Sequence, residues 1–219
     1  MGKSASKKKS AAAIAAGDDE SARGRLLSAA THLFCRYGIN ATGIDAIINE
    51  AGTAKTTLYK LFGSKTNLVN AVLESEGKAW REWFIGAMED GGGDAQAKLK
   101  RIFPALKRWF AEERFYGCPF INAVAEHDKD AKAFRNIALR HKKVVLAHIE
   151  RLAADMGAAE PQMLAHQLAL LIDGAIVAAM VSRDPGVADT AGLAAGNLFG
   201  PSRVKKPKRA GSVAELAAV

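Results

Sequence analysis

A run of hydrogen-bond donors between residues 53 and 65 has the composition of a surface that contacts phosphates and base edges. Its polar members include Lys55, Thr56, Thr57, Tyr59 and Lys60, and the run contains no Asp or Glu. Leu58 and Phe62 are left to pack against neighbouring elements. A short helix rich in donors and poor in acids fits the negatively charged groove of double-stranded DNA. Residues 21–70 hold six basic residues against two acids, a local surplus that favours the same function.

Two short helices and the start of a third are expected to position these donors. Thr42 and Asp45, three residues apart, predict a capping box at the start of the first. Ala51-Gly52 predicts the tight corner of a helix-turn-helix, because glycine adopts the backbone conformations that such a turn requires. Ser64 predicts the N-cap of a long third helix.

The segment Ala51-Gly52-Thr53-Ala54-Lys55-Thr56-Thr57-Leu58-Tyr59, followed by Phe62 and Ser64-Lys65, resembles the signature of TetR-type regulators. Residues 29–38 resemble that family's first helix, so the resemblance covers roughly residues 22–73. Ala54 stands where the family usually has a capping serine, and Thr56 where it usually has glycine. Thr53 is therefore expected to cap the recognition helix.

The resemblance implies a set of DNA contacts. They are Thr42, Thr53, Lys55, Thr56, Thr57, Tyr59, Lys60 and Lys65. Tyr59 and Lys65 match family positions that contact phosphates, and Thr42 is expected to do so through its hydroxyl and the free helix amides. Lys55 and Thr56 are expected at base edges and Thr57 at a phosphate, whereas Lys60 suits either. The alternatives are core packing for Tyr59 and a solvated side chain for Lys55.

Helical periodicity extends from Asp18 to Phe199 without strand alternation, which predicts an all-α protein. Nine helices are expected, the number of the TetR-like fold. The predicted organisation is a disordered basic arm (1–17), a helix-turn-helix domain (18–66), a ligand-binding and dimerisation domain (67–200) and a disordered basic tail (201–219). Residues 1–16 and 201–219 together carry the whole net charge of +8. Pro104 predicts a kink in a helix over residues 94–110.

The second domain contains most of the aromatic residues, which predicts an apolar ligand cavity with a few orienting polar groups. The expected ligand-binding residues are Trp80, Trp83, Phe84, Phe103, Trp109, Phe120, Asn122, His127, Phe134 and His141. The alternative is that these side chains only fill a core. His141 and His148 lie seven residues apart on one helix, about 10 Å along its axis, which is too far for one metal ion. We therefore expect no metal site and no cofactor.

An apolar helix near the carboxyl end is expected to pair with its symmetry mate in a homodimer, as in TetR-like proteins. The predicted interface residues are Leu168, Leu171, Ile172, Ala175, Ile176 and Ala179. Internal packing of the same residues is the alternative. A dimer is favoured because a single helix-turn-helix binds DNA weakly and paired ones read inverted half-sites.

Other classes of function are disfavoured. Cys118 has His127 nearby but lacks an acid or oxyanion motif, so an enzyme is not expected. A thiol-sensing role for Cys118 stays open and requires a lowered thiol pKa. The longest apolar run is interrupted by Asp173, so no membrane span is expected, and two cysteines suit the reducing cytoplasm.

These patterns together predict a cytoplasmic, nucleoid-associated regulator. We expect a repressor released from an inverted-repeat operator by a small apolar or aromatic effector. The alternative is an architectural DNA-binding protein that needs no effector.

Overall fold

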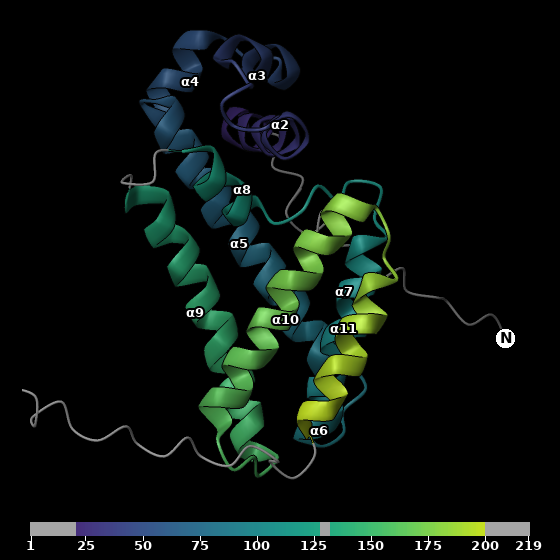
Figure 1. Cartoon of the computed structure of the whole chain (residues 1–219). Coiled ribbons are helices and arrows are strands. Elements are labelled where there is room, and N and C mark those ends of the chain that lie inside the picture. Colours follow the sequence, from purple (N-terminus) through teal and green to yellow (C-terminus); the bar gives the residue numbers. More distant parts are fainter. Residues whose placement is uncertain (1–20, 128–131, 200–219) are drawn as a thin grey trace, which may run out of the picture.

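The computed structural model describes residues 21–127 and 132–199, and within these ranges the chain forms helices and connecting segments without strands (Figure 1). The helices are α2 (Ala22–Tyr37), α3 (Ile44–Ala51), α4 (Lys55–Phe62), α5 (Lys65–Glu89), α6 (Ala95–Lys100), α7 (Ile102–Phe110), α8 (Pro119–Glu126), α9 (Lys132–Asp155), α10 (Pro161–Ser182) and α11 (Val187–Gly196). A 3₁₀ turn, η1 (Asn197–Phe199), follows α11. Each of the nine expected helices is present in these ranges, one of them divided in two. The predictions for the basic arm and the basic tail fall outside the described residues.

The expected helix over residues 94–110 divides at Arg101 into α6 and α7. Pro104 explains the break, because it has no N–H to donate to the carbonyl four residues earlier and its ring crowds that carbonyl. Pro104 is instead the third residue of α7, in the first turn, where an intrahelical donor is not required. The predicted mid-helix kink is therefore a helix boundary three residues before the proline.

Helices α2, α3 and α4 form a compact unit at one end of the molecule, and α5 runs from it into the larger helical body (Figure 1). Leu26, Ile47 and Leu58 are fully buried at the centre of this unit, one from each of its helices. Along the 25 residues of α5, Leu68 and Val72 pack near the unit, and Phe84 and Met88 are buried in the body. One continuous helix therefore joins the two parts.

Side-chain caps fix several helix starts. Ser64 Oγ accepts a hydrogen bond from Asn67 N at 3.1 Å, so the expected cap of α5 is confirmed, and Asp94 Oδ1 accepts one from Ala97 N at 2.7 Å at the start of α6. The capping box predicted from Thr42 and Asp45 is wrong, because the N-cap of α3 is Gly43 and makes no side-chain cap. Tyr37, the last residue of α2, is 55% exposed.

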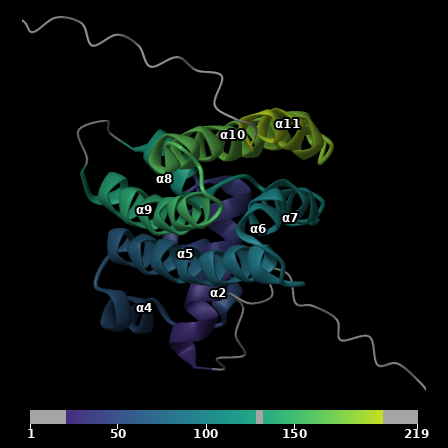
Figure 2. The ribbon, with the colours of Figure 1, turned by 90° about the horizontal axis from the view of Figure 1, so that it is seen from below.

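The body consists of layered helices (Figure 2). Helices α10 and α11 form an outer layer over α9 and α7, and α5 lies on the opposite side of α9 and α7. Among the described helices, α10 alone is long and apolar enough to cross a membrane, judged by length and composition. In this fold it packs against α9, α7 and α11, and it buries seven residues, from Leu164 to Ala179, on its inner face.

Candidate functional site

The helix-turn-helix is formed by α3, a glycine turn and α4. Gly52 ends α3 in the left-handed conformation, with φ of 59° and ψ of 44°, which glycine adopts without a side-chain clash. The Nε of Arg25 on α2 donates to the carbonyl of Ala51 at 3.1 Å and holds the turn against the first helix. Leu58 and Phe62 bury the inner face of α4.

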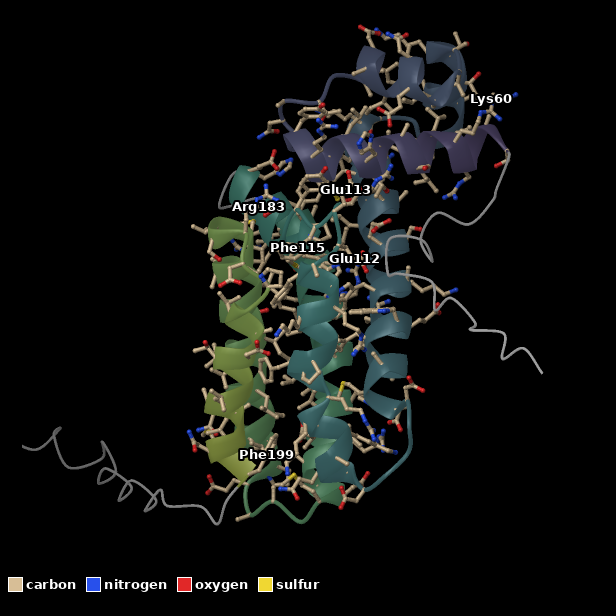
Figure 3. All side chains as sticks on the ribbon, turned by 90° about the vertical axis from the view of Figure 1, so that its right-hand side faces the viewer. Lys60, Glu112, Glu113, Phe115, Arg183 and Phe199 are labelled. Carbon is tan, nitrogen blue, oxygen red and sulfur yellow. The ribbon has the colours of Figure 1, made fainter. Side chains whose placement is uncertain are left out.

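The outer face of α4 carries the predicted donors. Lys55, Thr56 and Lys60 are exposed, Tyr59 is 44% exposed, and Thr57 is half-buried. Figure 3 shows Lys60 in the helix-turn-helix unit, at the end of the molecule opposite Phe199. Core packing is therefore not the role of Tyr59, and this face is free to approach DNA. Its individual base and phosphate contacts remain predictions.

Lys55 has a neighbour on the preceding helix. Its Nζ lies 3.1 Å from Oδ1 of Asp45 on α3, and both side chains are largely exposed. An exposed pair of this kind contributes little to stability. Its main consequence is that the pair holds the Lys55 ammonium near α3. To contact the edge of a DNA base, Lys55 has to break its ion pair with Asp45.

Two threonines do not have their predicted roles. Thr42 is 4% exposed, and its hydroxyl donates to the carbonyl of Gly38 at 2.7 Å, so a phosphate contact through this hydroxyl is wrong. Thr53 does not cap α4, because the N-cap is Ala54 and makes no side-chain hydrogen bond. The Thr53 hydroxyl is buried and has no partner among the described residues.

Lys65 is occupied within the protein. Its Nζ donates to the carbonyl of Ile39 at 2.6 Å, linking the start of α5 to the loop between α2 and α3. Burial lowers the pKa of Lys65, although nearby Glu126 opposes this shift. The predicted phosphate contact by a free Lys65 is therefore wrong for this geometry, which uses the ammonium to position the loop.

The same loop is attached to the body through α8. The backbone N–H of Asn40 donates to Oε2 of Glu126 at 2.9 Å, and Asn40 Nδ2 donates to the Glu126 carbonyl at 2.6 Å. Glu126 is the last residue of α8, while Pro119 and Phe120 at its start line the cavity described next. Helix α8 therefore connects the cavity with the DNA-binding unit.

A cavity of about 730 Å³ lies between the DNA-binding unit and the body. Its wall combines α2, from Arg23 to Cys35, with α5, the segment that precedes α8, α9 and α10. This volume is within the range of pockets for small organic ligands. The predicted cavity therefore exists, and the first helix of the DNA-binding unit forms part of it.

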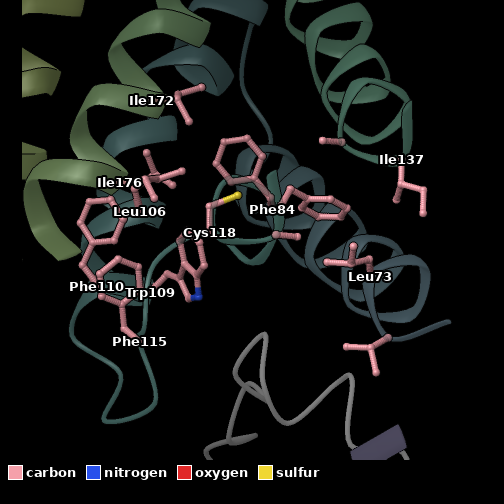
Figure 4. Close-up of a cluster of buried hydrophobic side chains, with 14 of the residues drawn as sticks. Leu73, Phe84, Leu106, Trp109, Phe110, Phe115, Cys118, Ile137, Ile172 and Ile176 are labelled. Atoms are coloured by element: carbon pink, nitrogen blue, oxygen red, sulfur yellow. The ribbon is translucent and has the colours of Figure 1, made fainter. Parts of the chain in front are cut away.

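Four of the ten predicted ligand-binding residues line this cavity: Trp80, Trp109, Phe120 and His141. Trp80 stacks on Phe84, with ring centroids 4.6 Å apart, and meets Trp109 edge-on at 5.4 Å. His141 stacks on Phe120 at 4.1 Å. Around this wall, Figure 4 shows Trp109, Phe110 and Phe115 gathered with Leu106 and Ile176, and Cys118 beside them.

The other six predicted residues lie outside the lining: Trp83, Phe84, Phe103, Asn122, His127 and Phe134. Phe84 is fully buried behind Trp80, and Phe103 packs against Gly192 of α11. Asn122 Nδ2 donates to the Tyr116 carbonyl at 3.2 Å, and His127 Nδ1 lies 2.7 Å from the Ala123 carbonyl, with its ring against Phe134. In this geometry the six lie outside the cavity wall, and a ligand contact by any of them stays a prediction.

Apart from His141, sequence reasoning missed the polar groups of the cavity, most notably Glu76 on α5. Burial raises the pKa of the Glu76 carboxyl to about 7, while a hydrogen bond from the Thr31 hydroxyl opposes this shift. Trp80 follows Glu76 by four residues, so the two share one face of the helix. The four-residue spacing of Glu76 and Trp80 was visible in the sequence and placed both on one face. The burial of Glu76, in contrast, depends on the packing of α2 over α5.

Three further titratable groups in the wall are held neutral. Burial raises the pKa of both thiols, Cys35 to about 12, with the Glu76 charge as a second cause for Cys35. The lowered pKa required of a sensing thiol at Cys118 is therefore contradicted. Burial lowers the pKa of His141 to about 3, and the Arg81 charge adds to this effect. Arg81 Nη1 lies 3.1 Å from His141 Nδ1, where only the arginine can donate.

The predicted dimer interface is on the wrong face of α10. Leu168, Ile172, Ala175, Ile176 and Ala179 are buried within one chain, and Leu171 is half-buried against the same core. The exposed apolar stripe of α10 consists instead of Met163, Leu170, Val177 and Val181, and Leu193 of α11 is also exposed. Leu170, Val181 and Leu193 are each at least 73% exposed.

Comparison with known proteins agrees with this architecture. Residues 26–72 match the family model of the bacterial regulatory proteins of the tetR family. A TetR-family transcriptional regulator from Streptomyces coelicolor is 30% identical, with a TM-score of 0.74 over 81% of this chain and 93% of that one. A helix-turn-helix regulator from Lactococcus lactis is 26% identical over 76% of this chain and 87% of its own length. The transcriptional activator FasR of Mycolicibacterium smegmatis is 46% identical over 52 residues, 24% of each chain. The chain belongs to the TetR family of helix-turn-helix transcriptional regulators.

Proposed function

We propose that this protein is a homodimeric, effector-responsive repressor. It binds an inverted-repeat operator through the outer face of α4 and leaves the operator when a small molecule fills the cavity. The observation that carries the proposal is the shared wall of that cavity, in which α2 of the DNA-binding unit faces α5, α9 and α10 of the body.

Two connections make the cavity suitable for controlling DNA binding. A ligand between α2 and α5 must change the packing of the first helix on the long one, or bind only where that packing already differs. Helix α8 runs from the cavity to Asn40, so displacement of its first turn is transmitted to the loop before α3. Both routes alter the orientation of α4, and operator affinity then depends on ligand concentration.

Dimerisation is assigned to the exposed stripe of α10 and α11. Met163, Leu170, Val177 and Val181 recur at spacings of seven, seven and four residues, so they share one exposed face of α10, and such an apolar stripe is unusual for an isolated chain. A second copy of this face is the occupant we propose, because a two-fold axis there pairs two recognition helices for one inverted repeat.

We assign a repressing role to the protein. A protein bound to an operator beside a promoter blocks RNA polymerase without making any further contact. The relative FasR is named an activator, so its short similarity does not carry this assignment. The proposed location is the cytoplasm, on the nucleoid.

The deciding experiment is selection of genomic DNA fragments by the purified full chain, with and without small-molecule extract from cells. We expect a common inverted repeat among the selected fragments, protected as one site by a dimer, and release of these fragments by the extract. A reporter gene whose promoter overlaps the repeat then shows whether the protein represses or activates transcription. Broad binding without a shared repeat, unaffected by extract, would instead establish the architectural alternative.

A further inference from the structure

Glu76 is a cavity-lining carboxyl group without a cationic partner in the described parts of the chain. Its hydrogen bond comes from the neutral hydroxyl of Thr31 on α2, and its charge raises the pKa of the neighbouring Cys35. The ion pairs within residues 21–127 and 132–199 do not include it. Removing a carboxylate from water without a compensating charge is unfavourable, and the raised pKa of Glu76 reflects this.

The cations around the cavity are either paired or at its rim. Besides two further histidines, His141 with its lowered pKa and the exposed His166, they are Arg23, His32, Arg114, Lys142 and Lys143. The Lys142 ammonium lies 2.5 Å from the Asp173 carboxylate, and His32 Nδ1 lies 2.7 Å from Glu50 Oε1. The other three side chains are exposed. An anionic ligand would have to remain at the surface or break an existing pair, whereas a cation that enters the cavity reaches Glu76.

The neighbours of Glu76 favour a cation with an apolar body. Trp80 lies one turn further along α5 on the same face, and Trp109 packs edge-on against it. Indole rings attract ammonium groups through their negative faces and also bury apolar surface. The cavity volume of about 730 Å³ leaves room for a substantial hydrocarbon part beside the ammonium group.

We propose that the effector is an amphipathic organic cation whose ammonium group pairs with Glu76 and whose apolar part lies against Trp80 and Trp109. The inference rests on the proposed effector-responsive function and specifies its ligand class. It also supplies a local mechanism, since an ammonium that pairs with Glu76 competes with the Thr31 hydroxyl. Binding would then weaken a contact between α2 and α5 at the junction of the two domains.

The test uses three probes that share one chain length and differ in charge: octylammonium, octanol and octanoate. Each is titrated into the full-length protein at pH 7.5, with calorimetry for binding and fluorescence anisotropy for release of selected DNA. We expect octylammonium to bind at least tenfold more tightly than the other two and to release DNA. Equal or tighter binding of octanol or octanoate, or no binding by any of the three, overturns the inference.

Two variants locate the charge recognition. Glu76→Gln is expected to reduce octylammonium affinity at least tenfold, to the level of octanol, while its melting curve shows a folded protein. Glu74→Gln changes an exposed carboxyl on the same helix, outside the cavity lining, and should leave all three affinities unchanged. Unchanged octylammonium binding in Glu76→Gln would also overturn the inference.

The two proposals fail in different ways. If octanol or octanoate binds and releases DNA as well as octylammonium does, effector control stands and the cationic class is wrong. If neither a probe nor the cell extract releases DNA, the proposed effector-responsive function itself is wrong.

Discussion

Lys55 and Lys65 both lie near the recognition helix, yet their surroundings give them different roles. Lys55 is exposed and paired only with a carboxylate on the surface, whereas Lys65 donates to the backbone of the loop before α3. A cation on the outer face can exchange its partner for DNA at little cost. One that holds a loop cannot do so without moving the loop.

Replacing Lys55 with alanine should therefore change sequence preference. Loss of one lysine contact to a base edge is expected to reduce discrimination at one operator position by about tenfold, with a smaller effect on random DNA. Binding curves on operator and scrambled DNA at two salt concentrations measure both quantities. Lys65→Ala serves as the contrast, because it should lower the melting temperature and reduce affinity for both DNAs equally. An unaltered sequence preference in Lys55→Ala would show that Lys55 does not contact the bases.

Glu76 makes a distinct contribution to the pH dependence of stability. Its pKa is about 7 in the folded chain against an ordinary value of 4.5, so between these values the folded state binds more protons than the unfolded state. Stability from this group therefore falls as pH rises from 4.5 to 7. After allowance for partial exposure, the effect is roughly 2 kcal/mol.

Glu76→Gln should accordingly gain stability relative to the parent chain as pH rises from 4.5 to 7, and the gain should level off above 7. Urea unfolding of both proteins across this range gives the difference directly, and the opposing contribution of His141 cancels because both chains contain it. A difference that stays constant with pH would mean that Glu76 titrates near its ordinary value.

At the scale of elements, α8 is short but touches two functional regions. It begins at the cavity wall and ends at Glu126, which accepts hydrogen bonds from Asn40 through a side-chain oxygen and through its backbone carbonyl. The connection is local, because these hydrogen bonds attach one loop of the DNA-binding unit, the loop between α2 and α3.

Glu126→Ala should loosen that loop without unfolding the body. The Asn40 amide loses its acceptor, so hydrogen exchange over residues 38–42 is expected to accelerate, while α9 and α10 keep the protection of the parent protein. Exchange followed by mass spectrometry provides the measurement. The matched variant Glu82→Ala removes an exposed carboxyl from α5. Equal exchange of the loop in both variants would show that Glu126 does not hold it.

At the scale of the whole molecule, the faces of α10 determine assembly. Ala175 and Ala179 lie inside one chain, whereas Leu170 and Val181 lie on its surface. Arginine at a buried position places an unpaired charge in the core, a change that is strongly destabilising. Arginine at the surface positions leaves the core intact and places like charges on the proposed dimer face.

Leu170→Arg and Val181→Arg should therefore yield folded monomers with parental helical content and weakened operator binding. Ala175→Arg should instead lose much of its helical signal. Sedimentation velocity and circular dichroism together distinguish the two outcomes. An intact dimer in both surface variants would place the interface elsewhere on the molecule.

The helix-turn-helix could be read from the sequence because its determinants are local. The Gly52 turn, the Ser64 cap and the apolar Leu58 and Phe62 act within a few residues, so type and spacing specify them directly. The same holds for the order of the helices. The local effect of proline on a helix also predicted a disruption at Pro104, three residues from the observed boundary at Arg101.

The orientation of polar groups required the tertiary structure. Thr42 and Lys65 fitted a phosphate-contacting motif, but their polar atoms donate to carbonyl groups in and beyond the carboxyl end of α2. The partner of Lys65 lies 26 residues earlier in the chain, and the inward turn of Thr42 depends on how the loop between α2 and α3 folds, so residue type and spacing do not distinguish the two uses. The burial of Glu76 is the same case, since it arises where α2 covers α5.

The sequence by itself determined that this chain is helical and contains a TetR-type helix-turn-helix, because those properties follow from short-range periodicity and from the residues of the turn. Only the tertiary structure decided which face of α10 is buried and which is free. Both of its faces are apolar, with Leu168 on one and Leu170 on the other, and periodicity cannot rank two apolar faces. The packing of α10 against α9, α7 and α11 determines which face is buried. These contacts join distant parts of the chain, so the local sequence pattern does not contain them.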